Sequence, residues 1–593
     1  MRKSLVLLSL LLVSQGMAED IPEVQVTATR VEVPIEHVGD DVEVITKEEI
    51  EKYGFTSIAD VLKYVAGVHV VSSGGWGKQT SVWIQGLSSE YILVLVNGIP
   101  INDPSTPGST ANFEWIDLSN VERIEVLKGS QSALYGSEAI AGVINIITKE
   151  PKKDKASITL EGGSYKTFKE KLKIDKIFNK GFSSIYLENF KISGFSATTS
   201  SPDDDPFRYT TGGISFGFYP TENLKIITDV QAKYGHNEYD NGEMDYKRLF
   251  AATRVSYLQS ENLIWNLKTS TNREKREYSY GNYIGYTNYL SLSPTYYFNE
   301  KSFLKAGINY RQERAETSAV GDKEVSLRSA FVEGHTEISK LYITGVGRID
   351  NHSLFGYYGT YKLSGAYSID KTETTFKLQY GTGFKAPTID QLYGYYPGFS
   401  WNGIYYPPTK GNPDLSPEKS RGWTVGVVQK LKKIRSLFEL NYFRNYIWNK
   451  IQSVNKTDYY TYENIGSGET KGIEVKARTI VSKHLSLYGK YTYINASENI
   501  RDRVPENSYI VGLNFKTKKL KMSTWIEHYS ERKDGENTLS PFTTLNCYAS
   551  YKLNDKTKLY LKGVNLTDEK YELAYGYNTM GRSIFAGVDI TFK

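Results

Sequence analysis

The fold is decided by residues 121–149, which read VERIEVLKGSQSALYGSEAIAGVINIITK. Apolar β-forming residues fill the first third of this stretch, and Val143 to Ile147 form a second apolar run. Gly129, Gly136 and Gly142 lie where the apolar pattern breaks, and glycine is the residue that most often marks a turn. The pattern predicts a strand, a tight turn, a short helix, a second turn and a second strand.

Together with the upstream run YILVLVNGIP at 91–100, this stretch resembles the plug domain of TonB-dependent outer-membrane receptors. The order of glycines, charges and apolar runs matches over tens of residues, so the resemblance is specific. It implies a transmembrane β-barrel of about 22 antiparallel strands with an N-terminal α/β plug domain inside the lumen. The domain division that we expect is a signal peptide at 1–18, a Ton box and linker at 19–35, the plug at 36–150 and the barrel at 151–593.

The amino terminus has the features of a secretory signal peptide. Arg2 and Lys3 precede an apolar run from Leu5 to Val13, and the small residues Gly16 and Ala18 stand at the two positions that a signal peptidase reads. We expect cleavage near Ala18 and a location in the outer membrane of a Gram-negative-type bacterium.

The rest of the chain contains no run of the ~18 apolar residues that a transmembrane helix needs. A membrane protein of this composition must therefore be a barrel, with outer-membrane lipid around it. The single cysteine, Cys547, excludes an internal disulfide and a cysteine-rich metal site. The formal net charge of +5 gives no argument for a nucleic-acid partner, and we expect a monomer.

The segment directly after the signal peptide is extended in character and resembles the Ton box of the family. That segment pairs with TonB, a protein anchored in the inner membrane with its energising complex, by adding a strand to a sheet. The alternative is an ordinary amino-terminal strand. The residues assigned to TonB binding are Glu23, Val24, Gln25, Val26, Thr27 and Ala28.

The expected plug begins with two short helices and carries two polar loops. Thr46 and Glu49 form a capping-box pattern, and a second helix from Ser57 to Val65 ends before Gly67. The loops at 72–79 and 102–112 are rich in glycine and polar residues, which suits a ligand platform on a rigid scaffold.

The tract from residue 156 onward alternates between apolar and polar positions, as strands between lipid and a polar lumen do. Ile214, Phe216 and Phe218 alternate with smaller or polar residues, and the last strand, 584–592, repeats the pattern. A soluble all-β protein is the alternative. Barrels of this type usually end on an aromatic residue, whereas here Phe592 is followed by Lys593.

Within the family, the plug match from Gly67 to Lys149 and the ending YGYNTMGR at 575–582 most resemble the cobalamin receptors. That resemblance implies that cobalamin, or another small metal complex, is the ligand. Trp76 is expected either to stack on a corrin face or to pack against the barrel wall. The implied ligand contacts are Trp76, Gln79, Ser81, Ser88 and Thr106.

Two acidic loops, 201–206 and 238–245, predict a cation site because so many carboxylates repel one another unless a cation joins them. Oxygen ligands on flexible loops suit Ca²⁺, and the cobalamin receptors use calcium in these loops. One position departs from that family, because the chain reads GFSA at 194–197 where the family has an acidic residue. One ligand is therefore either missing or supplied by Glu243. Two solvated acidic loops are the alternative. The implied structural calcium ligands are Asp203, Asp205, Tyr239 through its backbone, Asp240 and Asp245.

Several other functions are less consistent with the sequence. A haem receptor would carry a histidine between Phe384 and Asn412, where there is none, and His69 is better explained as an interior histidine. No Ser/His/Asp set or metal-ligating His/Cys cluster recurs at meaningful spacing, so we expect neither an enzyme nor a catalytic cofactor. A passive porin would need no Ton box or plug. We therefore predict TonB-dependent uptake of cobalamin or a related corrinoid, with a ferric siderophore or other metal chelate as the alternative.

Arg123, Glu125 and Lys128 are expected to be polar contacts between plug and lumen.

Overall fold

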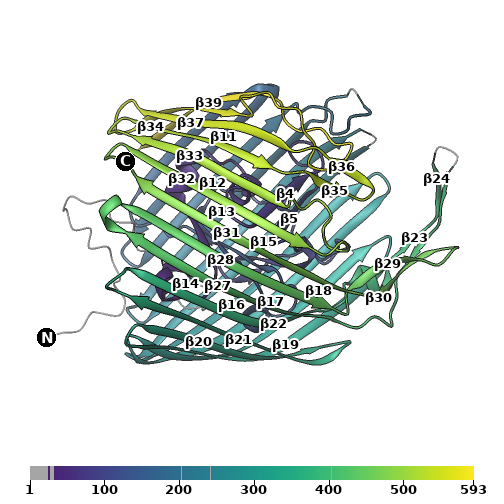
Figure 1. Cartoon of the computed structure of the whole chain (residues 1–593), viewed down its shortest axis with the longest axis horizontal. Helices are drawn as coiled ribbons and strands as arrows, with labels where there is room; N and C mark the ends of the chain where they lie inside the picture. Colours follow the sequence, from purple (N-terminus) through teal and green to yellow (C-terminus); the bar gives the residue numbers. More distant parts are fainter. Residues whose placement is uncertain (1–24, 27–32, 202, 241, 402–403, 593) are drawn as a thin grey trace.

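The computed structural model describes residues 25–26, 33–201, 203–240, 242–401 and 404–592. The predicted signal peptide and Glu23, Val24, Thr27 and Ala28 of the predicted Ton box lie outside the described residues. Figure 1 shows a barrel of long, tilted strands with the amino-terminal part of the chain inside it.

The barrel is one closed antiparallel sheet of 22 strands, as the sequence predicts, and β39 pairs with β10 to close it. Its strands are β10 (Lys155–Gly163), β11 (Thr167–Phe178), β12 (Gly181–Ile192), β13 (Phe207–Thr221), β14 (Leu224–Tyr239), β15 (Gly242–Ser260), β16 (Leu263–Tyr278), β17 (Gly281–Asn299), β18 (Ser302–Thr317), β19 (Gly321–Ile338), β20 (Leu341–His352), β21 (Gly356–Ile369), β22 (Thr374–Lys385), β27 (Glu418–Leu431), β28 (Ser436–Trp448), β31 (Ser467–Ile480), β32 (Leu485–Ala496), β33 (Asn507–Lys516), β34 (Leu520–Tyr529), β37 (Phe542–Lys552), β38 (Thr557–Val564) and β39 (Ser583–Phe592).

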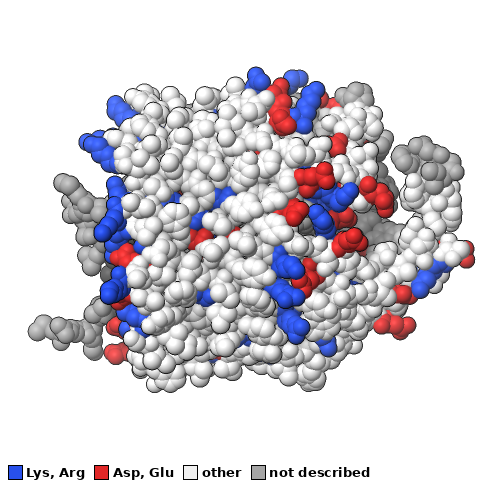
Figure 2. Space-filling view, viewed as in Figure 1, with Lys and Arg blue, Asp and Glu red and all other residues white. Residues whose placement is uncertain are grey.

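The two faces of these strands differ in polarity, as predicted. On β13, Ile214 is 52% exposed on the outside of the barrel, while its neighbour Ser215 is buried on the lumen side. On β39, Ile584 is 50% exposed and Phe585 only 3%. Figure 2 shows the result on one face of the barrel, where a mostly uncharged band lies between two rims at which most of the visible charged side chains gather. An apolar band between charged rims is the surface that a lipid bilayer requires.

The plug has a five-stranded sheet in the order β3-β8-β9-β6-β7. The predicted strand, helix and strand of residues 121–149 are β8, α3 and β9, and β8 and β9 pair in antiparallel fashion. The bounds are β3 (Val42–Thr46), β6 (Ile92–Val96), β7 (Ile99–Pro100), β8 (Val121–Lys128), α3 (Ser132–Tyr135) and β9 (Gly142–Thr148), with the 3₁₀ helices η1 (Ile35–His37), η2 (Ser89–Tyr91) and η3 (Phe113–Trp115).

Two capped helices and a hairpin complete the plug. Helix α1 (Lys47–Tyr53) has the predicted Thr46–Glu49 capping box, and α2 (Ile58–Lys63) has a second box formed by Ser57 and Asp60. Helix α2 ends at Lys63, before the predicted Val65, and the hairpin of β4 (Val68–Ser72) and β5 (Thr80–Ile84) follows Gly67, whose φ is +71°. Each capping box satisfies backbone N–H groups that the first helical turn leaves free, so these short helices are fixed by their own sequence.

The connection between the plug and the barrel runs from the end of β9 at Thr148 to the start of β10 at Lys155. Among the described residues, no helix is long and apolar enough to cross a membrane. The remaining elements are β1 (Gln25–Val26), β2 (Val33–Pro34), η4 (Ser164–Lys166), α4 (Ile389–Tyr393), β23 (Tyr395–Tyr396), β24 (Phe399–Trp401), β25 (Ile404–Tyr406), β26 (Thr409–Lys410), η5 (Lys432–Ile434), β29 (Ile451–Asn455), β30 (Tyr460–Asn464), β35 (Arg532–Asp534) and β36 (Asn537–Leu539). Strands β23, β24, β29 and β30 form an arm beyond one end of the barrel (Figure 1).

Candidate functional site

The glycine-rich loop at 72–79 connects β4 to β5 and lies against the loops that follow β12 and β14. Gly74 and Gly77 adopt φ values of +111° and +75°, which side chains with a Cβ rarely allow. The backbone N–H of Ser73 donates to the carbonyl oxygen of Gln79 at 3.0 Å and closes the loop. Gln79 is exposed, so it is the predicted ligand contact that the loop presents most openly.

The other predicted ligand contacts differ in accessibility. Ser81 and Ser88 are half-buried, and the Ser88 hydroxyl donates to a carboxylate oxygen of Glu90 at 3.3 Å. Thr106 is buried, and its hydroxyl donates to the Asp103 carbonyl at 2.9 Å and accepts from the N–H of Thr110 at 2.7 Å. Thr106 therefore stabilises the turn of its own loop and has no free hydroxyl to offer a ligand.

Trp76 packs against the barrel wall, which is one of the two arrangements that the sequence left open. Its ring lies 6.4 Å from that of Tyr165 and 6.2 Å, edge to face, from that of Phe585, measured between centroids. Trp76 also borders a cavity of about 190 Å³ between plug and wall, which Phe190, Phe207 and Glu114 help to line. Burial raises the pKa of Glu114 to about 8.

The two acidic loops do not assemble the predicted calcium ligands. Strands β14 and β15 extend to Tyr239 and Gly242, so the second loop is only a tight turn and its flanking residues alternate between the two faces of the wall. Asp245 lies on the outer face, where His236 Nδ1 is 2.8 Å from its Oδ1, while Asp205 is buried on the inner side. Asp203 is exposed. Glu243, the suggested substitute, also lies beside His236, 3.8 Å from Nε2. Within the described part of the chain, no group of three or more His, Cys, Asp or Glu side chains is placed to hold a metal ion.

A lysine that the sequence analysis did not select occupies the junction of these loops. Lys78 is 5% exposed, and its Nζ donates to Asn237 Oδ1 at 2.7 Å and to the backbone oxygens of Glu238 and Asp205. The sequence signal was a lone cation between Gly77 and Gln79.

A buried ion pair joins the plug to the lumen at Lys128, as predicted for that residue. Lys128, at the end of β8, pairs with Glu474 on β31 and lies 3.5 Å from Asp41, with both ends of the Glu474 pair fully buried. The other two residues of the predicted set, Arg123 and Glu125, pair with each other at 2.7 Å.

The segment FKAP at 384–387 also joins plug and wall. Lys385 is buried and lies 3.6 Å from Glu90 of the plug and 3.7 Å from Glu418 of β27. The backbone N–H of Ala386 donates to the Ser137 hydroxyl at 3.1 Å. The wall and plug are therefore held together by charged and polar contacts on several sides.

His69 is an interior histidine, as the sequence favoured. Its ring lies between Trp83 and Tyr529, at centroid distances of 6.2 and 5.1 Å. Burial holds the pKa of this imidazole well below its usual value, so the ring is neutral and enclosed.

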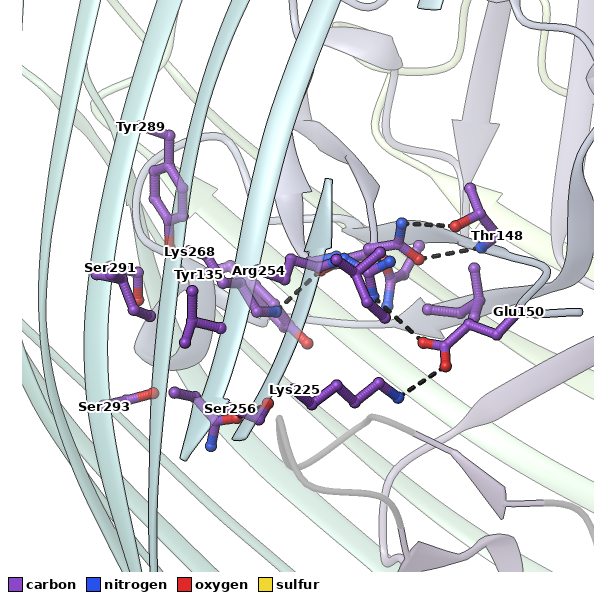
Figure 3. A pocket seen from close by; sticks show the side chains of 18 of the residues that line it. Tyr135, Thr148, Glu150, Lys225, Arg254, Ser256, Lys268, Tyr289, Ser291 and Ser293 are labelled. Atoms are coloured by element: carbon purple, nitrogen blue, oxygen red, sulfur yellow. Dashed lines mark hydrogen bonds and ion pairs between the residues drawn. The ribbon is translucent and has the colours of Figure 1, made fainter. Parts of the chain in front are cut away.

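A second cavity of about 250 Å³ lies between the plug and strands β14 to β18 (Figure 3). Its lining is rich in cations, and Lys225 Nζ pairs with Glu150 at 2.7 Å while Lys268 Nζ donates to the Asn97 carbonyl at 2.8 Å. Glu150 belongs to the connection between plug and barrel, so this cavity borders the place where the plug is tethered. The plug and the wall are therefore separated here by a cavity with a largely polar lining, and they do not pack through apolar side chains.

The two described residues of the predicted Ton box form a short strand. Gln25 and Val26 make up β1, which pairs in antiparallel fashion with β2, Gln25 opposite Pro34 and Val26 opposite Val33. An extended segment of this kind can exchange one strand partner for another.

Comparisons with known proteins match this architecture. The family model described as TonB dependent receptor-like, beta-barrel matches residues 175–566, and the TonB-dependent Receptor Plug Domain model matches residues 34–143. The vitamin B12 transporter BtuB of Photobacterium profundum is 29% identical, with 96% of this chain and 95% of that protein covered. BtuB of Vibrio vulnificus is 27% identical with the same coverage.

Among solved structures, the siderophore receptor PirA from Acinetobacter baumannii superposes with a TM-score of 0.81 at 18% identity, covering 93% of this chain and 98% of that one. A variant of the ferric enterobactin receptor PfeA from Pseudomonas aeruginosa gives 0.79 at 17% identity, with 93% and 98% covered. At such identities these structures show the shared fold.

Proposed function

The chain belongs to the family of TonB-dependent receptors, and from that premise we propose that it imports cobalamin or a related corrinoid across the outer membrane. The observation that carries the proposal is the full-length similarity, at 27–29% identity, to two vitamin B12 transporters. The siderophore receptors are similar in fold at 17–18% identity, and receptors with one fold take different ligands.

The first step is binding of the ligand at the mouth of the barrel, which is the end where the plug loop at 72–79 lies. The loop at 72–79 presents Gln79, and Ser81 and Ser88 lie half-buried behind it, so amide and hydroxyl groups face a ligand that carries many amide side chains. The Trp76 ring packs against Phe585 of the barrel wall, so we do not expect it to stack on the ligand.

Passage requires the plug to move, because the two plug–wall cavities described above are too small for a corrinoid. The cavities measure about 190 and 250 Å³, and buried pairs such as Lys128–Glu474 hold the plug in place. The outer membrane has no nucleotide supply, so the work must reach the plug through a physical link. Receptors of this family receive it from TonB, and we propose that Glu23 to Ala28 is the segment that TonB pulls. The described part of that segment is already extended in β1.

The test is equilibrium binding of cyanocobalamin to the purified receptor, with a ferric catecholate siderophore and haem measured in parallel. Saturable binding of cyanocobalamin, without competition from the siderophore, is the expected result. Saturable binding of the siderophore with no binding of cyanocobalamin would overturn the cargo assignment, and the family assignment would stand.

A further inference from the structure

The ammonium of Lys78 lies at the point where the plug meets two extracellular loops of the barrel. It donates to Asn237 Oδ1 at 2.7 Å, to the Glu238 carbonyl, and to the Asp205 carbonyl at 3.4 Å. These acceptors come from the loop after β12 and from the end of β14, so one side chain of the plug holds both.

Three carboxylates act electrostatically on Lys78, and one of them, Asp240, is buried without a partner. Both side-chain oxygens of Asp240 are buried and have no hydrogen-bond partner among the described residues. Asp205, Asp240 and Glu238 all raise the pKa of Lys78, while burial has the larger effect and lowers that pKa to about 8. The side chain is therefore mainly a cation at pH 7, and its charge offsets that of Asp240, whose carboxylate has no hydrogen-bond partner among the described residues.

We propose that Lys78 is a tethered cation that joins the two acidic loops to the plug and takes the place that a bound metal ion would otherwise fill. The glycine-rich loop, the loop after β12 and the β14–β15 turn then form one unit without calcium. This inference concerns the loops alone and is independent of which cargo the receptor carries.

The geometry of the acidic residues agrees with a lysine better than with calcium. Ca²⁺ takes 6–8 oxygen ligands, and two of the five predicted ligands do not face this site, since Asp245 pairs with His236 on the outer face and Asp203 is exposed. A divalent ion beside the buried ammonium would also be repelled by it. An ammonium needs only the few oxygen acceptors that are present.

The position of Lys78 gives the tether a mechanical consequence. It lies between Gly77 and the exposed Gln79, so a ligand that moves this loop must also move the two extracellular loops. Gly77 fixes the approach of the loop to the wall, because a Cβ there would lie 2.1 Å from Phe207 Cδ2. Occupancy of the mouth is thereby linked to the loops that surround it.

The experiment compares wild type with Lys78→Met and with a control, Lys153→Met, an exposed lysine on the plug–barrel connection. Hydrogen exchange of segments 193–206 and 238–245 is measured at pH 7 in EDTA and across a calcium titration, without cargo. In wild type and in the control, we expect protected loops and no response to calcium. In Lys78→Met, protection should fall about tenfold or more in EDTA, as the loss of hydrogen bonds to a charged group implies. Calcium at about 0.1–1 mM, the range of extracellular calcium modules, should restore part of that protection.

Lys78→Gln keeps a polar side chain with a hydrogen-bond donor but removes the charge. It therefore separates the effect of the charge from the effect of side-chain packing. We expect it to lose protection as Lys78→Met does. Folding of the barrel is checked by its heat-dependent migration on gels. Lys78→Met and Lys78→Gln should both migrate as wild type does. Saturable protection of the wild-type loops by calcium would overturn the proposal, and so would unchanged protection in Lys78→Met.

Discussion

Replacing Lys128 with methionine should loosen the plug selectively. Lys128 is fully buried, pairs with Glu474 of the wall, and lies 3.5 Å from Asp41 and 3.9 Å from Glu43 of the plug. Methionine fills a similar volume without the charge. The substitution leaves Glu474 in the interior with the Gln85 amide, at 3.1 Å, as its remaining plug contact.

The size of the effect follows from the burial of both partners. Removing one member of a buried ion pair costs about 3–5 kcal/mol, because the other charge is left without compensation. At about 1.4 kcal/mol per factor of ten, the population of the opened plug should rise roughly 10²- to 10⁴-fold. Glu43 keeps partners in Lys490, at 2.6 Å, and Lys476, at 3.6 Å, so the loss should centre on Glu474 and Asp41.

Hydrogen exchange of the amides in β8 and β9 measures this opening, because the two strands pair with each other in the centre of the plug sheet. The barrel strands serve as the internal control and should exchange as in wild type. The double variant Lys128→Met, Glu474→Gln removes both charges and should recover a large part of the lost protection. Exchange in β8 and β9 within about threefold of wild type in the single variant, a change of under about 1 kcal/mol, would refute the reasoning.

Three further predictions concern the coupling segment, the mouth and the pH dependence of the plug. Val26→Pro removes a backbone donor from the strand that TonB would extend, so uptake should be lost while binding of cargo is unchanged, and normal uptake would contradict the assignment. Gly77→Ala places a Cβ against Phe207 at a φ of +75°, so it should weaken cargo binding at least severalfold in an equilibrium titration, whereas wild-type affinity would show that the loop is not fixed there. Glu114 holds its proton in the folded plug up to about pH 8, against an ordinary pKa of 4.5, so the urea midpoint of plug unfolding should fall as pH rises from 4.5 to 8. Glu114→Gln should flatten that dependence, and an unchanged slope would exclude Glu114 as its cause.

Local sequence patterns predicted the parts of the structure that local interactions determine. The capping box of Thr46 and Glu49, the strand–helix–strand order of residues 121–149 and the alternation of β39 depend on neighbours within a few positions. The strand number came from the family resemblance, and the closed 22-stranded sheet confirms it.

The site was harder to predict because it depends on strand length and on distant partners. Asp245 was placed in a loop, but β15 begins at Gly242, and the two-residue period then directs Asp245 outward. A shift of one residue along a strand reverses the face of every side chain. Thr106 was assigned to the ligand, whereas the turn of its own loop uses its hydroxyl.

Long-range pairs gave no signal in the sequence. Lys78 meets Asn237 across 159 residues, and Lys128 meets Glu474 across 346. Their partners are selected by the register of the closed barrel around the plug, which no local pattern encodes. These contacts carry the present proposals about coupling at the mouth and retention of the plug.

The most direct test of energised corrinoid uptake is accumulation of labelled cyanocobalamin by bacteria that contain TonB and lack their own receptor. With this receptor expressed, cells should accumulate the label above its external concentration, and collapse of the proton gradient should stop accumulation. Deletion of residues 23–28 should leave surface binding intact and abolish accumulation. Accumulation that survives the deletion or the collapse of the gradient would contradict the account.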